Sequence, residues 1–503
     1  MSKHVVIIGS GIGGMGAACL LAHAGFRVTV LEKNEQIGGR MSILTQDGFT
    51  FDMGPSWYLM PDVFEHFFAL LGERVEDHLQ LTKLGPSYRI FFPDRVSPID
   101  IYSDLAKDLP TFESLEPGCT PRIQAYLDEA ARKYEISMQH FLYRNIDSLR
   151  DFFIPELAKQ GKGLSMITSM DRYTKGLFSS NELRQILQYT LVFLGNSPKN
   201  CPSLYSIMTH IDVSQGVYYP QGGLHTIVHA MHTLALARGV ITRTHAEVAK
   251  ISVHEGAVDG VLLKSGERIN ADVVISNADR HWTDTQLLDP GLGTTTERYW
   301  KNAVLAPSAQ ILYVGVEGRC DSLAHHNFIF ARNWEEHFST IFDAPRWPDD
   351  PSLYVCAPSR TDPSVAPDGC ENLFILVPIA PGFDRPISEQ QEFEDRMLEK
   401  IATQMHVPDF VKRIVVRQRF SVKDFRSRYF SVRGTALGLA HTLRQTSLLR
   451  PNNWNRRVQN LYYVGGNTVP GIGMPICLIG AELVFKRILG NRSGGPLPTP
   501  LHI

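Results

Sequence analysis

The N-terminal segment alternates between apolar runs and a glycine-rich turn, in the order strand, helix, strand. An apolar run at residues 5–8 leads directly into the glycine-rich stretch 9–14. Residues 15–24 follow, rich in alanine and leucine and free of proline, and a second apolar run at 27–31 ends on Glu32. Short apolar runs bounded by glycine predict buried parallel strands, and the segment between them predicts the connecting helix.

The glycine stretch has the G-x-G-x-x-G spacing of a dinucleotide-binding turn. In such a turn Gly9 makes the tight bend, Gly11 lets the backbone approach a pyrophosphate, and Gly14 lets helix and strand pack closely. Glu32 lies eighteen residues after Gly14, close to the ~20 typical of the acid that binds a ribose hydroxyl. The pattern predicts a dinucleotide site, with the pyrophosphate at the helix N-terminus, over a purely structural glycine turn.

Helical and strand periodicities continue along the rest of the chain. Apolar residues at helical spacing predict helices at residues 61–71, 120–137, 181–194, 224–237, 389–405 and 476–489. Alternating aromatic and β-branched residues predict strands within 88–101 and 248–275 and at 310–316, 373–377, 414–420 and 461–464. The proline-rich stretch 345–386 is expected to be mostly loop, and the last ten residues are expected to be disordered.

The predicted helix at residues 181–194 has an apolar face wider than a single stripe. Tyr189, Val192 and Phe193 add to the leucine and isoleucine positions. One interpretation is a fully buried core helix. The alternative is a wall of an apolar tunnel, or a surface that lies against lipid.

Composition narrows the choice of partners. The 503-residue chain is 43% hydrophobic and 20% charged with a formal net charge of -2, which offers no broad electrostatic attraction for nucleic acid. Its seven cysteines form no C-x-x-C pair, so we expect no metal site and no disulfide framework, as in a reducing compartment.

We expect no signal peptide, and no run reaches the ~18 apolar residues of a spanning helix.

Two further glycine-rich elements indicate which dinucleotide the site binds. Gly38, Gly39 and Arg40 form a turn after Glu32, where an NAD-type unit would enter its next helix. Near the C-terminus a strand at 461–464 leads through a tight glycine loop into a helix, which makes a second seat for an anion or a carbonyl oxygen. The first of these turns resembles the second glycine motif of flavoproteins of the glutathione-reductase-like superfamily.

Taken together, these motifs resemble the bacterial-type phytoene desaturase family, the FAD-dependent carotenoid desaturases. The resemblance spans nearly the whole chain. Its marks lie at residues 9–14, 38–40, 48–55, 194–198, 216–223, 449–453 and 461–475. One departure from the wider superfamily is Gly466, where many relatives have an acid that contacts the flavin ribityl chain or phosphate.

The resemblance implies an α/β fold with a discontinuous, glutathione-reductase-like Rossmann domain for FAD. A mixed-sheet substrate domain and a helical, apolar, membrane-facing region would complete it. We place the FAD-binding segments at 1–81, 216–285 and 426–492, the substrate segments at 82–215 and 286–425, and a tail at 493–503. FAD, rather than NAD(P)H, would be held by Gly9, Ser10, Gly11, Gly13, Gly14, Glu32, Lys33, Gly38, Gly39, Arg40, Gly54, Pro55, Val248, Gly465, Gly466, Gly473, Met474, Pro475 and Ile476.

The implied reaction removes two hydrogens from a CH2–CH2 unit beside a conjugated polyene. A hydride would pass to FAD and a proton to a base, with electrons passing on to quinone or O2. The resemblance suggests Asp147 and Arg150 for proton handling, whereas their spacing alone also fits a surface ion pair. We predict conversion of phytoene to lycopene by a cytoplasmic enzyme bound peripherally to the inner face of the cell membrane.

Other functions remain open at this stage. Nearby alternatives are a C30 diapophytoene desaturase or another carotenoid desaturase, isomerase, ketolase or saturase. A more distant alternative is a non-catalytic prenyl-lipid-binding protein of the same fold, similar to the Rab GDP-dissociation inhibitors.

Overall fold

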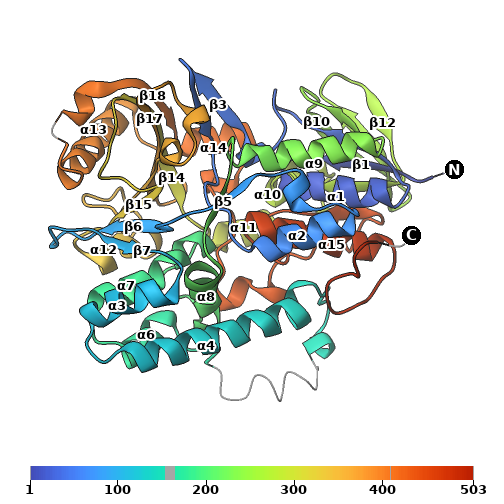
Figure 1. Ribbon diagram of the computed structural model, residues 1–503. Helices are drawn as coiled ribbons and strands as arrows, with labels where there is room; N and C mark the ends of the chain where they lie inside the picture. The colour runs from blue at the N-terminus through green and yellow to red at the C-terminus, as the bar shows by residue number, and fades with distance from the viewer. Residues whose placement is uncertain (1, 153–164, 408, 502–503) are drawn as a thin grey trace.

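A five-stranded parallel sheet forms one half of the molecule (Figure 1). The computed structural model describes residues 2–152, 165–407 and 409–501. In spatial order the strands are β19 (Leu461–Tyr463), β13 (Val273–Ser276), β1 (His4–Ile8), β2 (Arg27–Leu31) and β9 (Ile241–Arg243). The sheet therefore combines the start, the middle and the end of the chain, while the domain limits given above stay predictions.

Both faces of this sheet are covered, which explains why its strands are apolar throughout. Val5 and Ile7 pack toward helices, and Val6 and Ile8 pack toward a second, antiparallel sheet. The helices are α1 (Ile12–His23), α2 (Pro61–Leu70), α9 (His225–Ala237) and α15 (Met474–Ile488). The antiparallel sheet consists of β10 (Val248–His254), β11 (Ala257–Leu263) and β12 (Arg268–Asn270).

The other half contains a seven-stranded mixed sheet. Its strands, in order, are β18 (Ile414–Phe420), β14 (Ser308–Glu317), β17 (Cys370–Ile379), β16 (Leu353–Cys356), β15 (His326–Ile329), β6 (Tyr88–Phe91) and β7 (Ile99–Ile101). One face packs against α13 (Ile387–Gln404) through residues such as Leu398 and Ile401. The opposite face presents aromatic side chains to the interior of the molecule.

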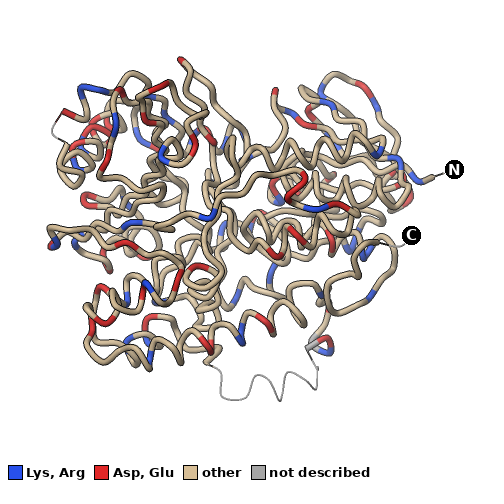
Figure 2. Tube along the Cα trace, in the orientation of Figure 1, with Lys and Arg blue, Asp and Glu red and all other residues tan. Residues whose placement is uncertain are grey.

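Helices below the mixed sheet complete the fold (Figure 1). They are α3 (Leu105–Leu115), α4 (Thr120–Ser137), α6 (Met170–Leu177), α7 (Asn181–Gln188) and α8 (Ile207–His210). Shorter elements elsewhere are β3 (Ile43–Gln46), β4 (Phe49–Asp52), β5 (Leu81–Lys83), β8 (Tyr218–Pro220), α10 (Arg280–Trp282), α11 (Glu297–Asn302), α12 (Trp334–Phe342) and α14 (Val422–Tyr429). Acidic and basic residues are interspersed along the trace (Figure 2), and no helix of the described ranges is long and apolar enough to cross a bilayer.

Most predicted helices and strands are confirmed, with ends that shift by one to a few residues. The helix predicted at 181–194 is wrong in its second half. The α-helix ends at Gln188, and residues Tyr189–Leu194 continue as a tighter 3₁₀ helix up to Gly195, whose φ is 65°. Aromatic and β-branched residues lose side-chain freedom in an α-helix, and here their packing decides the backbone instead.

Two strands, β15 and β16, were not predicted; β16 is a short apolar strand within the proline-rich stretch.

The expectation that the C-terminal residues are disordered is wrong, because they pack against α2 and α15 up to Leu501. Leu497 is buried and donates its N–H to Glu482, and the Leu501 N–H donates to the Leu70 carbonyl at 3.1 Å. Burial of Leu497 and these two hydrogen bonds hold a segment that its prolines alone did not predict to be ordered.

Candidate active site

A large cavity lies between the two halves of the molecule. Its volume is about 1040 Å³, at the upper end of the ~300–1,000 Å³ typical of small-molecule sites. The carboxyl ends of β1, β2, β13 and β19 form one wall, and the mixed sheet and the segment that follows α7 form the other. Ligands of open parallel sheets bind beyond the carboxyl ends of the strands, so this position matches the predicted dinucleotide site.

The first glycine motif forms the turn between β1 and α1. A Cβ atom at Gly14 would approach the Gly9 carbonyl oxygen to under 3.0 Å, closer than real Cβ atoms come. Glycine is therefore required where helix and turn meet. Gly14 itself does not line the cavity, whereas Gly9, Gly11 and Gly13 do. Helix α1 begins after Gly11 with no side-chain cap, so its first N–H groups are available to an anion.

Glu32 lies at the end of β2, where the sequence placed the ribose-binding acid. One carboxylate oxygen accepts from the Ser10 N–H at 3.0 Å and the Ser10 hydroxyl at 2.8 Å. The other accepts from the Asn34 N–H and side-chain amide, each at 2.9 Å. Ser10 thus lies behind the cavity wall and orients Glu32. A carboxylate has about four acceptor positions, so a ribose hydroxyl would compete with or share these bonds.

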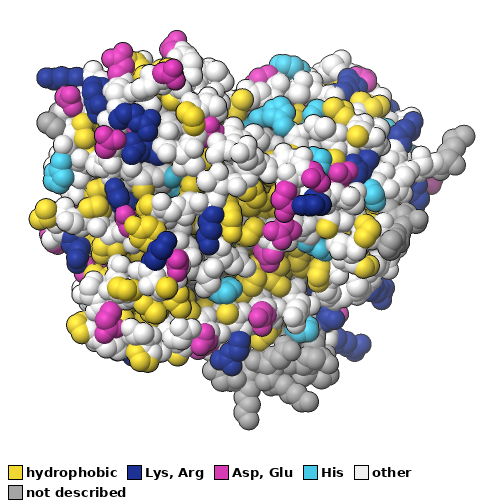
Figure 3. Space-filling view, in the orientation of Figure 1, with side chains coloured by type: hydrophobic (Ala, Val, Ile, Leu, Met, Phe, Trp, Pro, Cys, Tyr) yellow, Lys and Arg dark blue, Asp and Glu magenta, His cyan; other side chains and the backbone are white. Residues whose placement is uncertain are grey.

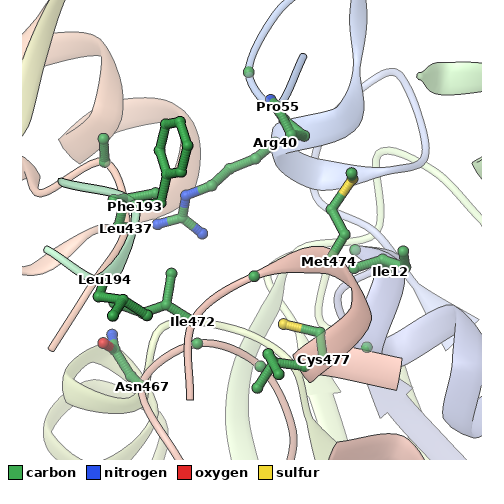
Figure 4. Close-up of a pocket in the computed structure, with 18 of the residues that line it drawn as sticks. Ile12, Arg40, Pro55, Phe193, Leu194, Leu437, Asn467, Ile472, Met474 and Cys477 are labelled. Atoms are coloured by element: carbon green, nitrogen blue, oxygen red, sulfur yellow. The ribbon is translucent and has the colours of Figure 1, made fainter. Parts of the chain in front are cut away.

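The second glycine turn places Arg40 in the cavity wall. The guanidinium reaches toward Phe193 and Leu437 in Figure 4, and its Nη2 donates to the Ser431 hydroxyl at 2.7 Å. Gly38, Gly39, Gly54 and Pro55 line the cavity beside it. A Cβ atom at Gly54 would approach the Arg40 carbonyl oxygen to under 3.0 Å, so this second turn also depends on glycine.

The C-terminal element supplies a third part of the wall. Gly465 and Gly466 follow β19, and α15 begins after Gly473 without a side-chain cap. Met474, Pro475 and Ile476 line the cavity at this N-terminus, as do Lys33 and Val248 from the other strands. The Lys33 ammonium donates to the Ser427 carbonyl at 2.9 Å, and its partial burial lowers its pKa.

The predicted wide apolar face serves two purposes. Leu183, Ile186 and Leu187 are buried in the core, as the core interpretation required. Beyond Gln188, Tyr189 and Phe193 line the cavity, as the tunnel interpretation required. Contact of this region with lipid stays a prediction.

The buried carboxyl group of Asp212 supports the aromatic part of the cavity wall that includes Tyr189. Asp212 accepts a hydrogen bond from the Tyr88 hydroxyl at 2.8 Å, and Tyr88 packs on Tyr189 with ring centroids 5.0 Å apart. Burial raises the pKa of Asp212 to about 7. This group orients the aromatic wall of the cavity.

Asp147 and Arg150 are not brought into the cavity wall among the described residues. The Asp147 carboxylate accepts from Arg487 at 2.7 and 2.9 Å and from Asn452 at 2.8 Å. These hydrogen bonds and the Arg487 charge outweigh desolvation and lower the pKa of Asp147. Arg150 is exposed in a short 3₁₀ turn. This geometry favours the ion-pair interpretation, although with Arg487 instead of Arg150, and their catalytic role stays an untested prediction.

Sequence analysis did not assign three polar residues that hold the site. Asp279 lines the cavity after β13, where it accepts from the Asn467 amide at 2.8 Å, and burial raises its pKa against the opposing charge of Arg40. The His441 ring bonds the Tyr205 hydroxyl at 2.9 Å and accepts the Ile472 N–H at 3.2 Å. Arg450 donates to backbone carbonyl groups of the loop that leads into α15. Two signals in the sequence pointed to these residues: Asp279 follows a predicted strand, and Arg450 lies within the family mark at 449–453.

Comparisons with known proteins agree with this geometry. The flavin containing amine oxidoreductase family matches residues 12–482. A carotenoid 3,4-desaturase of Haloarcula japonica is 47% identical over 97% of this chain and 98% of its own length. A zeta-carotene-forming phytoene desaturase of Myxococcus xanthus is 36% identical over 97% of this chain and 94% of its own length. The structure of a putrescine oxidase has the same fold, with a TM-score of 0.63 at 16% identity, over 98% of this chain and 100% of that one.

The residues present fit FAD. The uncapped N-terminus of α1 suits the pyrophosphate, and the uncapped N-terminus of α15 suits a carbonyl oxygen of the flavin ring. Glu32 suits a ribose hydroxyl, and the glycines leave space that Cβ atoms would fill. The chain therefore belongs to the flavin-containing amine oxidoreductase family and, within it, to the FAD-dependent carotenoid desaturases.

Proposed function

We propose that this carotenoid desaturase inserts the 3,4 double bond into a carotenoid that already carries a conjugated polyene. The observation that carries this proposal is the identity of 47% to a carotenoid 3,4-desaturase over almost the full length of both chains. The identity to a zeta-carotene-forming phytoene desaturase is lower, at 36% over a similar length.

The cavity supports a long hydrocarbon substrate. Val192, Phe193, Leu437 and Ile472 line it beside the glycine turns that hold FAD, and Figure 4 shows Phe193, Leu437 and Ile472 around Arg40. The mostly apolar wall excludes water and offers a hydrocarbon few polar groups, each of which would cost roughly 1–3 kcal/mol if buried without a partner. When bound, FAD would supply the oxidising power to remove a hydride from one of two adjacent CH2 carbons, and a base would take up the second hydrogen as a proton.

The second candidate is the conversion of phytoene to lycopene, which the sequence analysis predicted. The relative named a zeta-carotene-forming phytoene desaturase supports phytoene as the substrate, because the match extends over nearly all of both chains, but its printed product is zeta-carotene and not lycopene. The two candidates differ in substrate and need no difference in cofactor.

Product analysis distinguishes the two candidates. The gene is expressed separately in cells that accumulate lycopene and in cells that accumulate phytoene, and the pigments are extracted and separated. We expect a product of lycopene with two fewer hydrogens and a longer conjugated system, and unchanged phytoene. Lycopene formed from phytoene would instead establish the second candidate. Conversion of only a C30 diapophytoene would reject both.

We also propose that the protein binds peripherally to the cytoplasmic face of the membrane, where quinone or O2 takes up the electrons. The support comes from the edge of the cavity. Leu443 and Leu449 line it, yet they are 49% and 61% exposed. Hydrophobic side chains also gather in patches on the face shown in Figure 3. Apolar side chains at a cavity edge would let a lipid-soluble substrate enter without crossing water.

Liposome flotation tests this membrane proposal. Leu443→Ser with Leu449→Ser is expected to reduce the membrane partition coefficient at least tenfold, because the two half-exposed leucines would together gain about 1.5–3 kcal/mol on burial in lipid. The matched control is Leu262→Ser with Val415→Ser, which changes two exposed apolar residues that do not line the cavity. Wild-type protein that stays wholly in the soluble fraction would contradict the proposal.

A further inference from the structure

Arg450 is a buried cation whose hydrogen-bond acceptors, within the described ranges of the chain, are all backbone carbonyl groups. Its guanidinium donates to the carbonyl oxygens of four residues. The acceptors are Thr468 at 3.1 Å, Gln445 at 3.0 Å, Leu439 at 3.0 Å and Gly466 at 2.5 Å. With 3% of its surface exposed, Arg450 ties two loops together from the inside.

Among the described residues, Arg450 has no acidic partner, whereas other buried cations in this protein have one. Arg280 contacts Asp284 at 3.1 Å, and Lys486 contacts Glu482 at 3.5 Å. The groups that favour the charged form of Arg450 are Tyr205, Tyr299 and Cys477, none of which is a carboxylate. Burial lowers the pKa of Arg450 to about 10, so it remains a cation at neutral pH. Removing a cation from water without a counter-ion is costly.

The position of Arg450 suggests what this positive charge does. Two of its acceptors, Gly466 and Thr468, line the cavity on the loop that leads into α15. Arg40 points into the same part of the cavity (Figure 4), and the positive end of the α15 dipole faces it. Burial raises the pKa of the Cys477 thiol, and the positive charges of Arg40 and Arg450 both oppose this rise. The electrostatic fields of the two arginines therefore reach the same group. In an apolar interior such fields are weakly screened.

We propose that Arg450 is a positioning residue for the flavin seat, which also raises the reduction potential of bound FAD through its uncompensated positive charge. The four hydrogen bonds fix the loop that carries Gly466 and Thr468. The positive charge stabilises the anionic reduced flavin more than the neutral oxidised flavin. The inference rests on FAD binding by this family and is independent of which carotenoid the enzyme uses.

The reduction potential of the purified, FAD-loaded protein tests this inference. Arg450→Met removes the charge, and Arg450→Lys keeps it while losing most of the hydrogen bonds. We expect Arg450→Met to lower the potential by about 30 mV, the two-electron equivalent of a tenfold change. Arg450→Lys is expected to stay near the wild-type value. Sulfite, which adds to oxidised flavin as an anion, should bind about tenfold more weakly to Arg450→Met.

Two further variants make the test independent of folding defects. Arg238→Met is the control, because Arg238 also donates to two carbonyls but contacts Glu73, and neither of its acceptors, Leu71 and Leu234, lines the cavity. If Arg450→Met does not retain FAD, Arg450→Gln decides, since its amide removes the charge, keeps a donor for the carbonyl groups and should lower the potential in the same direction. An unchanged potential in flavin-loaded Arg450→Met or Arg450→Gln would overturn the inference, as would an equal drop in Arg450→Lys.

Discussion

Gly14→Ala is expected to abolish FAD binding at ordinary flavin concentrations. The new Cβ atom would meet the backbone carbonyl oxygen of Gly9, and the position of a Cβ atom is set by its own backbone, so no side-chain rotation relieves the collision. Overpacking of this kind costs up to ~3 kcal/mol, which corresponds to a roughly hundredfold loss of affinity if the turn must reshape to bind FAD. The measurement is the ratio of flavin to protein absorbance after purification, followed by FAD titration.

Gly176→Ala is the matched control for this variant. Gly176 lies in α6, and a Cβ atom there would meet nothing within 4 Å. Alanine in an open helical position is expected to be neutral or slightly stabilising, by up to ~1 kcal/mol. A Gly14→Ala protein that purifies with a full complement of flavin would show that the turn tolerates a side chain, and the close-packing argument would be wrong.

Glu32→Ala is expected to weaken FAD binding by about 1.5–3 kcal/mol, the range for hydrogen bonds to a charged group. In Kd this is roughly ten- to 150-fold. The structure adds a second reason, because the substitution also removes the acceptor for Ser10 and Asn34. Isothermal titration of the protein without flavin measures the affinity directly.

Two variants separate these contributions. Ser10→Ala removes one donor to Glu32 but keeps the carboxylate, so its loss of affinity should be the smaller one. Glu35→Ala is the control, since Glu35 is a nearby acid whose side chain is 47% exposed and pairs with Arg428. Unchanged FAD affinity in Glu32→Ala would remove Glu32 from the site and leave it only the task of bracing the turn.

The flavin seat could be predicted from the sequence because its signals are local. Turns such as 9–14 and 38–40 depend on backbone conformation and on close approach between neighbouring segments, which few residues other than glycine permit. The structure places these turns, the acid after β2 and the uncapped N-terminus of α15 around one cavity, while their contacts with FAD stay predictions. Asp279 lies after β13 and accepts from Asn467, the residue that follows Gly466, and no spacing along the chain predicted this contact.

Residues whose role depends on a distant partner were assigned less well. The family resemblance suggests Asp147 and Arg150 for proton handling, and their spacing also fits an ion pair, but the partner of Asp147 is Arg487, 340 positions away. Tyr189 and Phe193 continue the apolar pattern of α7, yet their backbone leaves the α-helix and their rings join the cavity wall. The Arg450 charge is equally invisible in the sequence, since its four acceptors are backbone carbonyls of other loops.

Residue patterns predicted the parallel-sheet core and the three glycine elements, which follow from short-range rules on turns, burial and helix ends. The flavin-dependent carotenoid desaturase family was predicted from the resemblance of motifs along the chain. Only the tertiary structure decided which side chains surround the substrate cavity, which carboxylate joins Arg487, and where a buried cation lacks a counter-ion. The physical reason is that burial, pKa and hydrogen-bond satisfaction depend on groups brought together by folding, whose separation along the chain carries no local signal.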